Sequence, residues 1–206
     1  KFENKYLYKI LRLNNQPDIH LCKNINKEDY YSDIQYIVQR QFNSLLNESS
    51  YESVLVFSDY NKGTLNVHIS KYEEINKVKL AIVDSKYNSL HSSLFDFAEN
   101  YIWRCTGEEY NSDFAKRFDY VIWTDGQNPI KLLDKKQNVI KIFKVPAVNV
   151  VDSCGVGDTF TASFASYMFK SSSLKIKNIE EAILFSIKAS VDVIQKSKTA
   201  ITNIKI

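Results

Sequence analysis

Four short apolar segments recur along the middle of the chain and constrain its fold more than any other feature. They are Val54–Phe57, Leu80–Val83, Tyr101–Trp103 and Tyr120–Trp123, and their starts lie about 19 to 26 residues apart. Polar or helical segments separate them. This rhythm is typical of βαβ units, so it predicts a parallel sheet that is covered by helices.

Segments on either side extend this pattern. Residues Asp29–Asn47 carry apolar side chains at helical spacing and predict an amphipathic helix. Residues Lys5–Leu13 alternate polar and apolar side chains, which predicts an exposed or edge strand. Two apolar segments, Ile130–Leu133 and Val139–Phe143, are separated by the polar residues 134–138 and predict an antiparallel hairpin. The chain is therefore expected to form an α/β fold.

Composition narrows the class of protein and its partners. A length of 206 residues favours a single domain, residues 1–206, and 44% hydrophobic with 25% charged residues is usual for a globular protein. The net charge is only +3, with lysines scattered among acids, which argues against a nucleic-acid partner. Three dispersed cysteines do not suit a disulfide framework or a zinc site. With no signal peptide and no apolar run of about 18 residues, we expect a cytoplasmic protein without a membrane partner.

A glycine-rich turn within residues 150–160 is the strongest sign of a functional site. It joins a short apolar strand to an amphipathic helix that is expected to open at about Asp158. The amides of Gly155, Val156 and Gly157, with the positive end of the helix dipole, would hold an anion, most often a phosphate. A carboxylate beside that anion can accept a proton from an attacking hydroxyl. The pattern suggests phosphoryl transfer to an alcohol; the alternative is that Asp158 only caps the helix.

Polar residues also come at the ends of the apolar segments. They are Asp59, Asp84, Cys105, Thr124 and Asp152. In open parallel sheets, ligands bind beyond the carboxyl ends of the strands. We therefore expect these residues, although they are far apart in the sequence, to gather at one edge of the sheet.

The glycine-rich turn also carries a resemblance to a known family. Residues Asp152–Asp158 read D-S-C-G-V-G-D and resemble the C-terminal signature of the ribokinase-like (PfkB) carbohydrate and nucleoside kinases, roughly D-[ST]-x-G-A-G-D. The resemblance continues through two predicted helices, Thr159–Phe169 and Ile179–Gln195. Within this superfamily the chain is most similar to the heptose-7-phosphate kinase domain, whose phrases SDY-x-KG-x-L and VD-x-K have counterparts in Ser58–Leu65 and Val83–Lys86.

The resemblance implies both a fold and a reaction. The fold is ribokinase-like α/β, a mainly parallel sheet flanked by helices, with a C-terminal antiparallel hairpin and a remnant of a lid strand at Lys5–Leu13. The reaction is ATP-dependent phosphorylation of a sugar or sugar-phosphate hydroxyl. Its leading substrate is D-glycero-D-manno-heptose 7-phosphate, phosphorylated at position 1. Mg²⁺ is the implied metal, and a monovalent cation is a further implied ligand.

Individual residues take roles from the same resemblance. Asp158 would be the general base, and Gly155, Val156 and Gly157 would form the anion hole. The other assignments are nucleotide contacts (Thr124, Gly126, Ser186), Mg²⁺ through water (Glu108), the monovalent cation (Asp152) and the substrate edge (Asp59, Lys62). Plainer alternatives stay open. The segment Thr124–Gly126 can be an ordinary turn after a strand, Glu108 a solvated side chain, and Asp59–Lys62 a polar turn.

Several residues depart from the family pattern. Cys105 and Ser186 each replace an asparagine, Pro129 replaces a glycine, and Cys154 replaces a threonine. A cysteine is a poor partner for a hard cation such as Mg²⁺. These departures leave two other functions open: a catalytically degenerate binding or scaffold domain, and a nucleoside kinase.

The length of the chain adds a further expectation. Members of the resembled family are longer, and the resemblance maps this chain to roughly the C-terminal two-thirds of their kinase domain. Their N-terminal portion supplies the first sheet strands and much of the sugar pocket. The sequence leaves open whether the chain is part of a longer polypeptide or lacks that portion, and whether it forms a homodimer.

Overall fold

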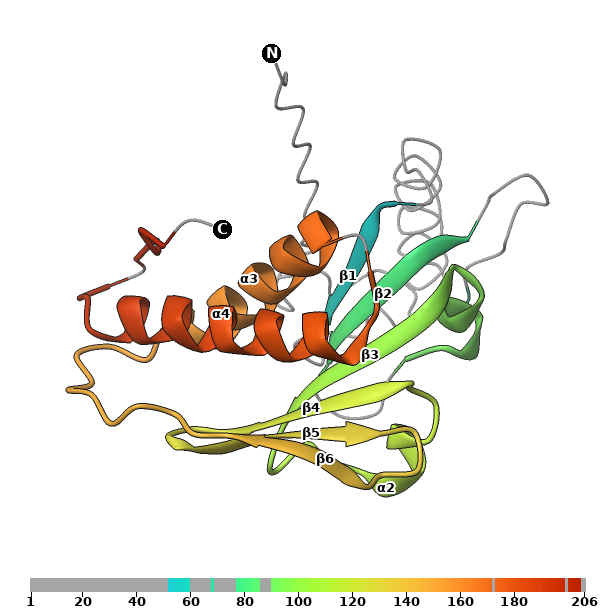
Figure 1. Cartoon of the computed structure of the whole chain (residues 1–206), viewed down its shortest axis with the longest axis horizontal. Helices are drawn as coiled ribbons and strands as arrows, with labels where there is room; N and C mark the ends of the chain where they lie inside the picture. Colours follow the sequence, from blue (N-terminus) through green and yellow to red (C-terminus); the bar gives the residue numbers. More distant parts are fainter. Residues whose placement is uncertain are drawn as a thin grey trace, which may run out of the picture.

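The computed structural model describes residues 52–59, 68, 77–85, 90–171, 173–198 and 200–204. These residues form one six-stranded sheet with its strands in sequence order, β1-β2-β3-β4-β5-β6 (Figure 1). The strands are β1 (Val54–Asp59), β2 (Val78–Ser85), β3 (Ala98–Thr106), β4 (Tyr120–Asp125), β5 (Asn128–Asp134) and β6 (Val139–Phe143). The first four are parallel to one another, and β5 and β6 are antiparallel to their neighbours.

These strands confirm the predicted parallel sheet and the predicted hairpin of β5 and β6. Each parallel strand extends beyond its apolar segment, and β3 runs three residues further in both directions, from Ala98 to Thr106. The antiparallel part begins earlier than expected, because β4 already pairs with β5 across a short turn at Gly126–Gln127. The predicted strand Lys5–Leu13 and helix Asp29–Asn47 lie outside the described residues.

Burial explains the different sequence patterns of the strands. The inner strand β2 is covered on both faces and is almost continuously apolar, from Val78 to Val83. At one edge of the described sheet, β1 alternates, with Leu55 and Phe57 buried and Val56 exposed. At the other edge, β6 is apolar in sequence, yet of its five residues only Phe143 is buried.

Two long helices, α3 (Val156–Ser171) and α4 (Ile176–Ile194), pack together and cover one face of the sheet (Figure 1). Each repeats a buried apolar side chain every four residues, as an amphipathic helix requires. In α3 these are Phe160, Phe164 and Met168, and in α4 they are Ile179, Ile183 and Ile187. They enclose a core with the sheet residues Leu80, Ile82, Ile102, Ile122 and Leu132.

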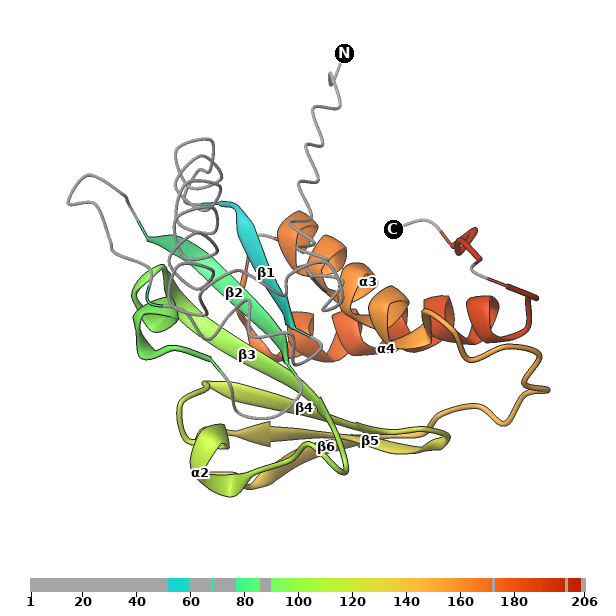
Figure 2. The same cartoon turned by 180° about the vertical axis from the view of Figure 1, so that it is seen from behind.

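The opposite face carries an aromatic core. There lie the short helix α2 (Ser112–Ala115; Figure 2) and the 3₁₀ helix η1 (Ser92–Asp96). Trp103, Phe97, Phe114 and Phe118 belong to one buried cluster, in which the Trp103 ring contacts the rings of Phe114 and Phe118. Both predicted C-terminal helices are confirmed, but each begins three residues before its predicted start. None of the described helices has the length and apolar character that crossing a membrane requires.

Candidate active site

The glycine-rich turn forms the N-terminus of α3. Gly155 has a φ of +76°, a left-handed conformation that strains residues with a Cβ, and its carbonyl accepts the first helical hydrogen bond from the Thr159 amide at 2.8 Å. Gly155 is therefore the cap position. Val156, Gly157 and Asp158 are the first three residues of the helix, so their amides have no partner four residues earlier. The Val156 amide lies 3.4 Å from the Ser153 carbonyl.

Asp158 is the third residue of α3, and its side chain is exposed. Asp158 is therefore not the N-cap residue, because Gly155 holds that position and the helix has already begun at Val156. A carboxylate in the first turn interacts favourably with the positive end of the helix dipole. The structure thus brings the predicted anion-binding amides and the predicted base into a single helical turn.

Asp152 holds this turn in place from the other side. Its Oδ1 accepts the Cys154 amide at 2.9 Å, and its Oδ2 accepts the Lys198 amide at 3.1 Å. The Val151 and Asp152 amides both donate to the Ile194 carbonyl at the end of α4. The Asp152 carboxylate therefore links the turn to the C-terminal end of α4. Its proposed contact with a monovalent cation stays a prediction.

Beneath the turn lies Arg104, a residue that belongs to none of the predicted site motifs. Its Nη1 donates to Asp84 Oδ1 at 3.1 Å, and Thr161 in α3 donates its hydroxyl to Asp84 Oδ2 at 2.6 Å. The guanidinium lies so close to Gly157 that a Cβ at residue 157 would be 3.1 Å from Nη2. A signal was present in the sequence, because Arg104 is a charged residue inside the otherwise apolar segment Tyr101–Cys105.

Strand register decides which of the edge residues face α3. On β2, β3 and β4, the side chains of Asp84, Arg104 and Thr124 lie on the same face as the core residues that α3 and α4 cover. Asp59 pairs with Ser85 rather than with Asp84, so it lies on the opposite face and is buried there. The expected gathering at the carboxyl edge therefore splits between two faces of the sheet.

Cys105 belongs to that opposite face. It is completely buried in the aromatic core, and burial strongly raises the pKa of its thiol. The thiol is therefore protonated at neutral pH. This cysteine packs as a small apolar residue and gives no donor to a metal or a nucleotide.

The segment Thr124–Gly126 ends β4 and turns into β5. The Thr124 hydroxyl is nearly buried and donates to the Cys105 carbonyl at 3.0 Å. Gly126 has a φ of +54° in the turn, and the Asn128 side chain donates to Asp125 Oδ2 at 3.0 Å. Pro129 lies in β5 rather than in a loop. A hairpin turn accounts for these contacts, and the nucleotide contacts of Thr124 and Gly126 stay predictions.

The other predicted ligand residues lie in varied surroundings. Glu108 is exposed in the turn after β3, while its neighbour Glu109 accepts the Thr106 amide at 2.7 Å. Ser186 is fully buried in α4 and donates its hydroxyl to the Ala182 carbonyl at 2.7 Å, so that hydroxyl is already used within the helix. Lys62 lies outside the described residues. Among the residues that are described, no three His, Cys, Asp or Glu side chains form a metal-binding group.

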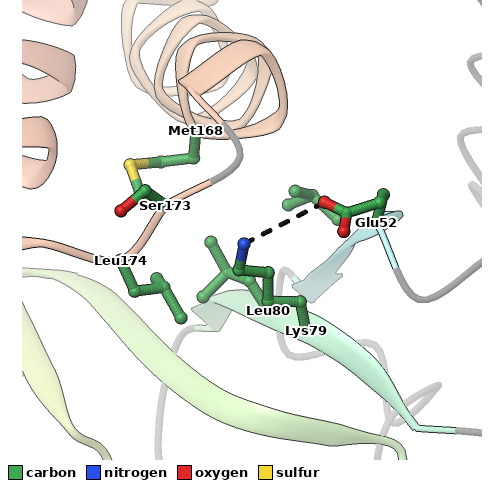
Figure 3. A pocket seen from close by; sticks show the side chains of 7 residues that line it. Glu52, Lys79, Leu80, Met168, Ser173 and Leu174 are labelled. Carbon is green, nitrogen blue, oxygen red and sulfur yellow. Dashed lines mark ion pairs between the residues drawn. The ribbon is translucent and has the colours of Figure 1, made fainter.

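A small pocket lies away from this turn, near the amino ends of β1 and β2 (Figure 3). It is bordered by Val54 and Leu80, by Met168 near the end of α3, and by an ion pair in which Lys79 Nζ lies 3.9 Å from Glu52 Oε2. Its volume of about 10 Å³ is close to that of a single water site. The pocket is too small for a nucleotide or a sugar, so it does not belong to the candidate site.

Comparison with known proteins supports this interpretation of the fold. Residues 110–206, which include the turn at Gly155–Asp158, match the pfkB family of carbohydrate kinases. The chain is similar to the crystal structure of a phosphofructokinase-2 variant from Escherichia coli, with a TM-score of 0.54 and 18% identity over 75% of this chain and 55% of that chain. It is also similar to ribokinase from Thermotoga maritima, with a TM-score of 0.51 and 17% identity over 76% of this chain and 54% of that chain.

These likenesses establish the ribokinase-like α/β fold that the sequence predicted. The chain spans about half the length of the solved structures that it matches. No curated protein sequence matches it.

Proposed function

We propose that this chain is part of an ATP-dependent kinase that transfers a phosphoryl group to a hydroxyl of a sugar, a sugar phosphate or a nucleoside. The observation that carries the proposal is the first turn of α3, where backbone amides without helical partners adjoin the exposed carboxylate of Asp158. The match of residues 110–206 to a family of carbohydrate kinases supports the same reaction.

In the proposed reaction, each feature of the turn has one task. The Asp158 carboxylate accepts the proton of the attacking hydroxyl. The amides of Gly155, Val156 and Gly157 stabilise the negative charge on the transferring phosphoryl oxygens. Asp152 keeps the turn in place through its hydrogen bonds to the Cys154 and Lys198 amides. Preorganised donors of this kind require no rearrangement during the reaction, which is why they lower its barrier.

Mg²⁺ would neutralise charge on the nucleotide phosphates. The described residues offer no cluster of acidic side chains, so the ion would be held mainly by those phosphates and by water, as Mg²⁺ commonly is. The exposed Glu108 is the side chain that we propose for a contact through water.

Two classes of phosphoryl acceptor fit the proposal, a sugar phosphate and a nucleoside. The resemblance at Ser58–Leu65 and Val83–Lys86 favours heptose 7-phosphate, and a nucleoside is equally compatible with the fold. The chain spans about half of the solved structures that it matches, so we propose that further residues of a longer kinase domain complete the acceptor site. A panel of sugars, sugar phosphates and nucleosides, assayed for acceptor-dependent ADP formation, would identify the class.

Substitution of the proposed base tests the reaction. We expect Asp158→Asn to lower acceptor-dependent ADP formation about 10²- to 10⁴-fold while the circular dichroism spectrum stays unchanged. Asp113→Asn is the matched control, because Asp113 is also an exposed acid in the first turn of a helix, α2, on the other face of the sheet. Full turnover in the Asp158→Asn variant would refute the assignment.

A non-catalytic binding or scaffold domain is the second candidate. Cys105 and Ser186 favour it, because both stand where the resembled family has an asparagine and both are fully buried in this structure. Titration of the chain with ATP separates the two candidates. Magnesium-dependent ATP binding supports the kinase, whereas no binding at millimolar ATP supports the scaffold.

A further inference from the structure

We propose that Arg104 is an anion-binding residue of this site and contacts the terminal phosphate of the bound nucleotide. The inference rests on the proposed kinase function and adds a side-chain ligand to the backbone amides of the α3 turn. Three observations lead to it: the place of the guanidinium against Gly157, its incomplete set of acceptors, and the way in which Asp84 and Thr161 hold it.

The first observation is the close approach of Arg104 to the turn. The guanidinium extends from β3 and lies beneath the first turn of α3, where the position of a Cβ on residue 157 would be 3.1 Å from Nη2 and 3.3 Å from Nη1. Only glycine gives the guanidinium this space without a shift. An anion held by the Gly157 amide would therefore lie beside a fixed positive charge.

The second observation concerns the donors of the guanidinium. Its several N–H groups form a planar fork that suits the oxygens of a carboxylate or a phosphate. Among the described residues, Asp84 Oδ1 accepts a hydrogen bond from Nη1, and the Nε atom is buried without any acceptor. A buried donor without an acceptor is costly, and the side chain as a whole is 15% exposed. A phosphate at the turn would supply acceptor oxygens to Nη2, the guanidinium nitrogen nearest to Gly157.

The third observation is that the guanidinium is held from below. Asp84 of β2 accepts Arg104 with one oxygen and the Thr161 hydroxyl with the other, so donors from two elements, β3 and α3, fix the carboxylate. Its side chain is 14% exposed, which limits screening of the ion pair by water. The guanidinium is thereby fixed in position before any ligand binds, and such preorganisation favours tight binding.

A nucleotide series tests the contact directly. The chain and its Arg104→Gln variant are titrated with ATP, ADP and AMP in the presence of Mg²⁺, with binding followed by calorimetry. We expect the substitution to weaken ATP about 10- to 100-fold, the loss typical of a hydrogen bond to a charged group, and to leave AMP within about twofold. Arg117→Gln is the control, because Arg117 lies over the Phe95 ring on the other face of the sheet.

Two further variants separate ligand binding from a structural role. Asp84→Asn removes the negative charge, but its amide oxygen can still accept the Arg104 Nη1 hydrogen bond and its amide nitrogen can donate to the Thr161 hydroxyl oxygen. The guanidinium is then still held in place, so we expect this variant to bind ATP about threefold more tightly, because a negative charge near the phosphate is lost. A purely structural role of Arg104 would make Asp84→Asn and Arg104→Gln weaken ATP alike. Should Arg104→Gln fail to fold, Arg104→Lys keeps the charge without the fork, and we expect it to weaken ATP about tenfold.

The outcomes distinguish this inference from the proposed function. If the Arg104 variants fold and bind ATP as tightly as the unmodified chain does, the proposed role of Arg104 is overturned. The kinase proposal then stays intact. Absence of ATP binding by the unmodified chain would overturn both. A loss confined to ATP, together with tighter binding by Asp84→Asn, would support the assignment.

Discussion

The hydrogen bond from Thr161 to Asp84 offers a direct test of how α3 is held against the sheet. Thr161 is buried, and its Oγ1 lies 2.6 Å from Asp84 Oδ2. Thr161→Val keeps the shape of the side chain and removes the donor. A hydrogen bond to a charged group contributes about 1.5–3 kcal/mol, and the added methyl group returns up to about 0.8 kcal/mol of apolar burial. We therefore expect the free energy of unfolding to fall by about 1–2 kcal/mol.

Urea unfolding followed by circular dichroism measures this change. With a slope of about 2 kcal/mol per molar urea, the midpoint should fall by about 0.5–1 M without a change of slope. Ser163→Ala is the matched control, because Ser163 is also buried in α3 and alanine has the better helix propensity. We expect that variant to be as stable as the original chain or slightly more stable.

The result that would refute this reasoning is a Thr161→Val variant whose free energy of unfolding falls by less than about 0.5 kcal/mol, the usual range for surface changes. Asp84 would then be held by Arg104 alone, and the hydroxyl would add nothing to the attachment of α3. A loss of several kcal/mol in the Ser163→Ala control would also contradict it, because the loss would then reflect general disturbance of the helix.

Two further predictions concern ionisable groups. Cys105 is buried and its thiol pKa is strongly raised, whereas Cys154 is exposed. Iodoacetamide at pH 8 should therefore modify Cys154 and spare Cys105 until the chain is unfolded. Equal modification of the two cysteines, measured by mass spectrometry, would contradict the burial of Cys105. Hydrogen bonds from Lys196, the Asn203 amide and Thr202 lower the pKa of Asp192 to about 2, below its unfolded value of about 3.9. This stabilisation is present above about pH 4 and is lost as the pH falls through 2. Melting temperatures of the original chain and Asp192→Asn should therefore converge toward pH 2, and a difference independent of pH would speak against this linkage.

Much of the fold could be predicted because it depends on local patterns. The apolar segments of β1 to β4 and the amphipathic periods of α3 and α4 report which side chains must be buried, and burial selects the element. The turn at Gly155 was equally accessible, because a residue with φ of +76° is best supplied by glycine. Element boundaries were less accurate, since Val156 and Gly157 already belong to the helix.

The composition of the candidate site depended on contacts that no local pattern encodes. Whether an edge residue faces α3 is set by strand register, which places Asp84 and Thr124 on one face and Asp59 and Cys105 on the other. The sequence likewise does not tell whether the Ser186 hydroxyl is available to a ligand. In the structure that hydroxyl donates to the Ala182 carbonyl.

The sequence alone therefore determined the glycine-rich turn and the sheet that precedes it, because both follow from backbone conformation and from the period of apolar residues. Only the tertiary structure decided what lies beneath the turn. Arg104 and Gly157 are separated by many residues, and they meet because the parallel sheet and α3 pack face to face, with the Asp84 carboxylate bridging Arg104 and Thr161. Arg104 stands out in the sequence as a charge inside an apolar segment, but only long-range packing decides that it lies against Gly157.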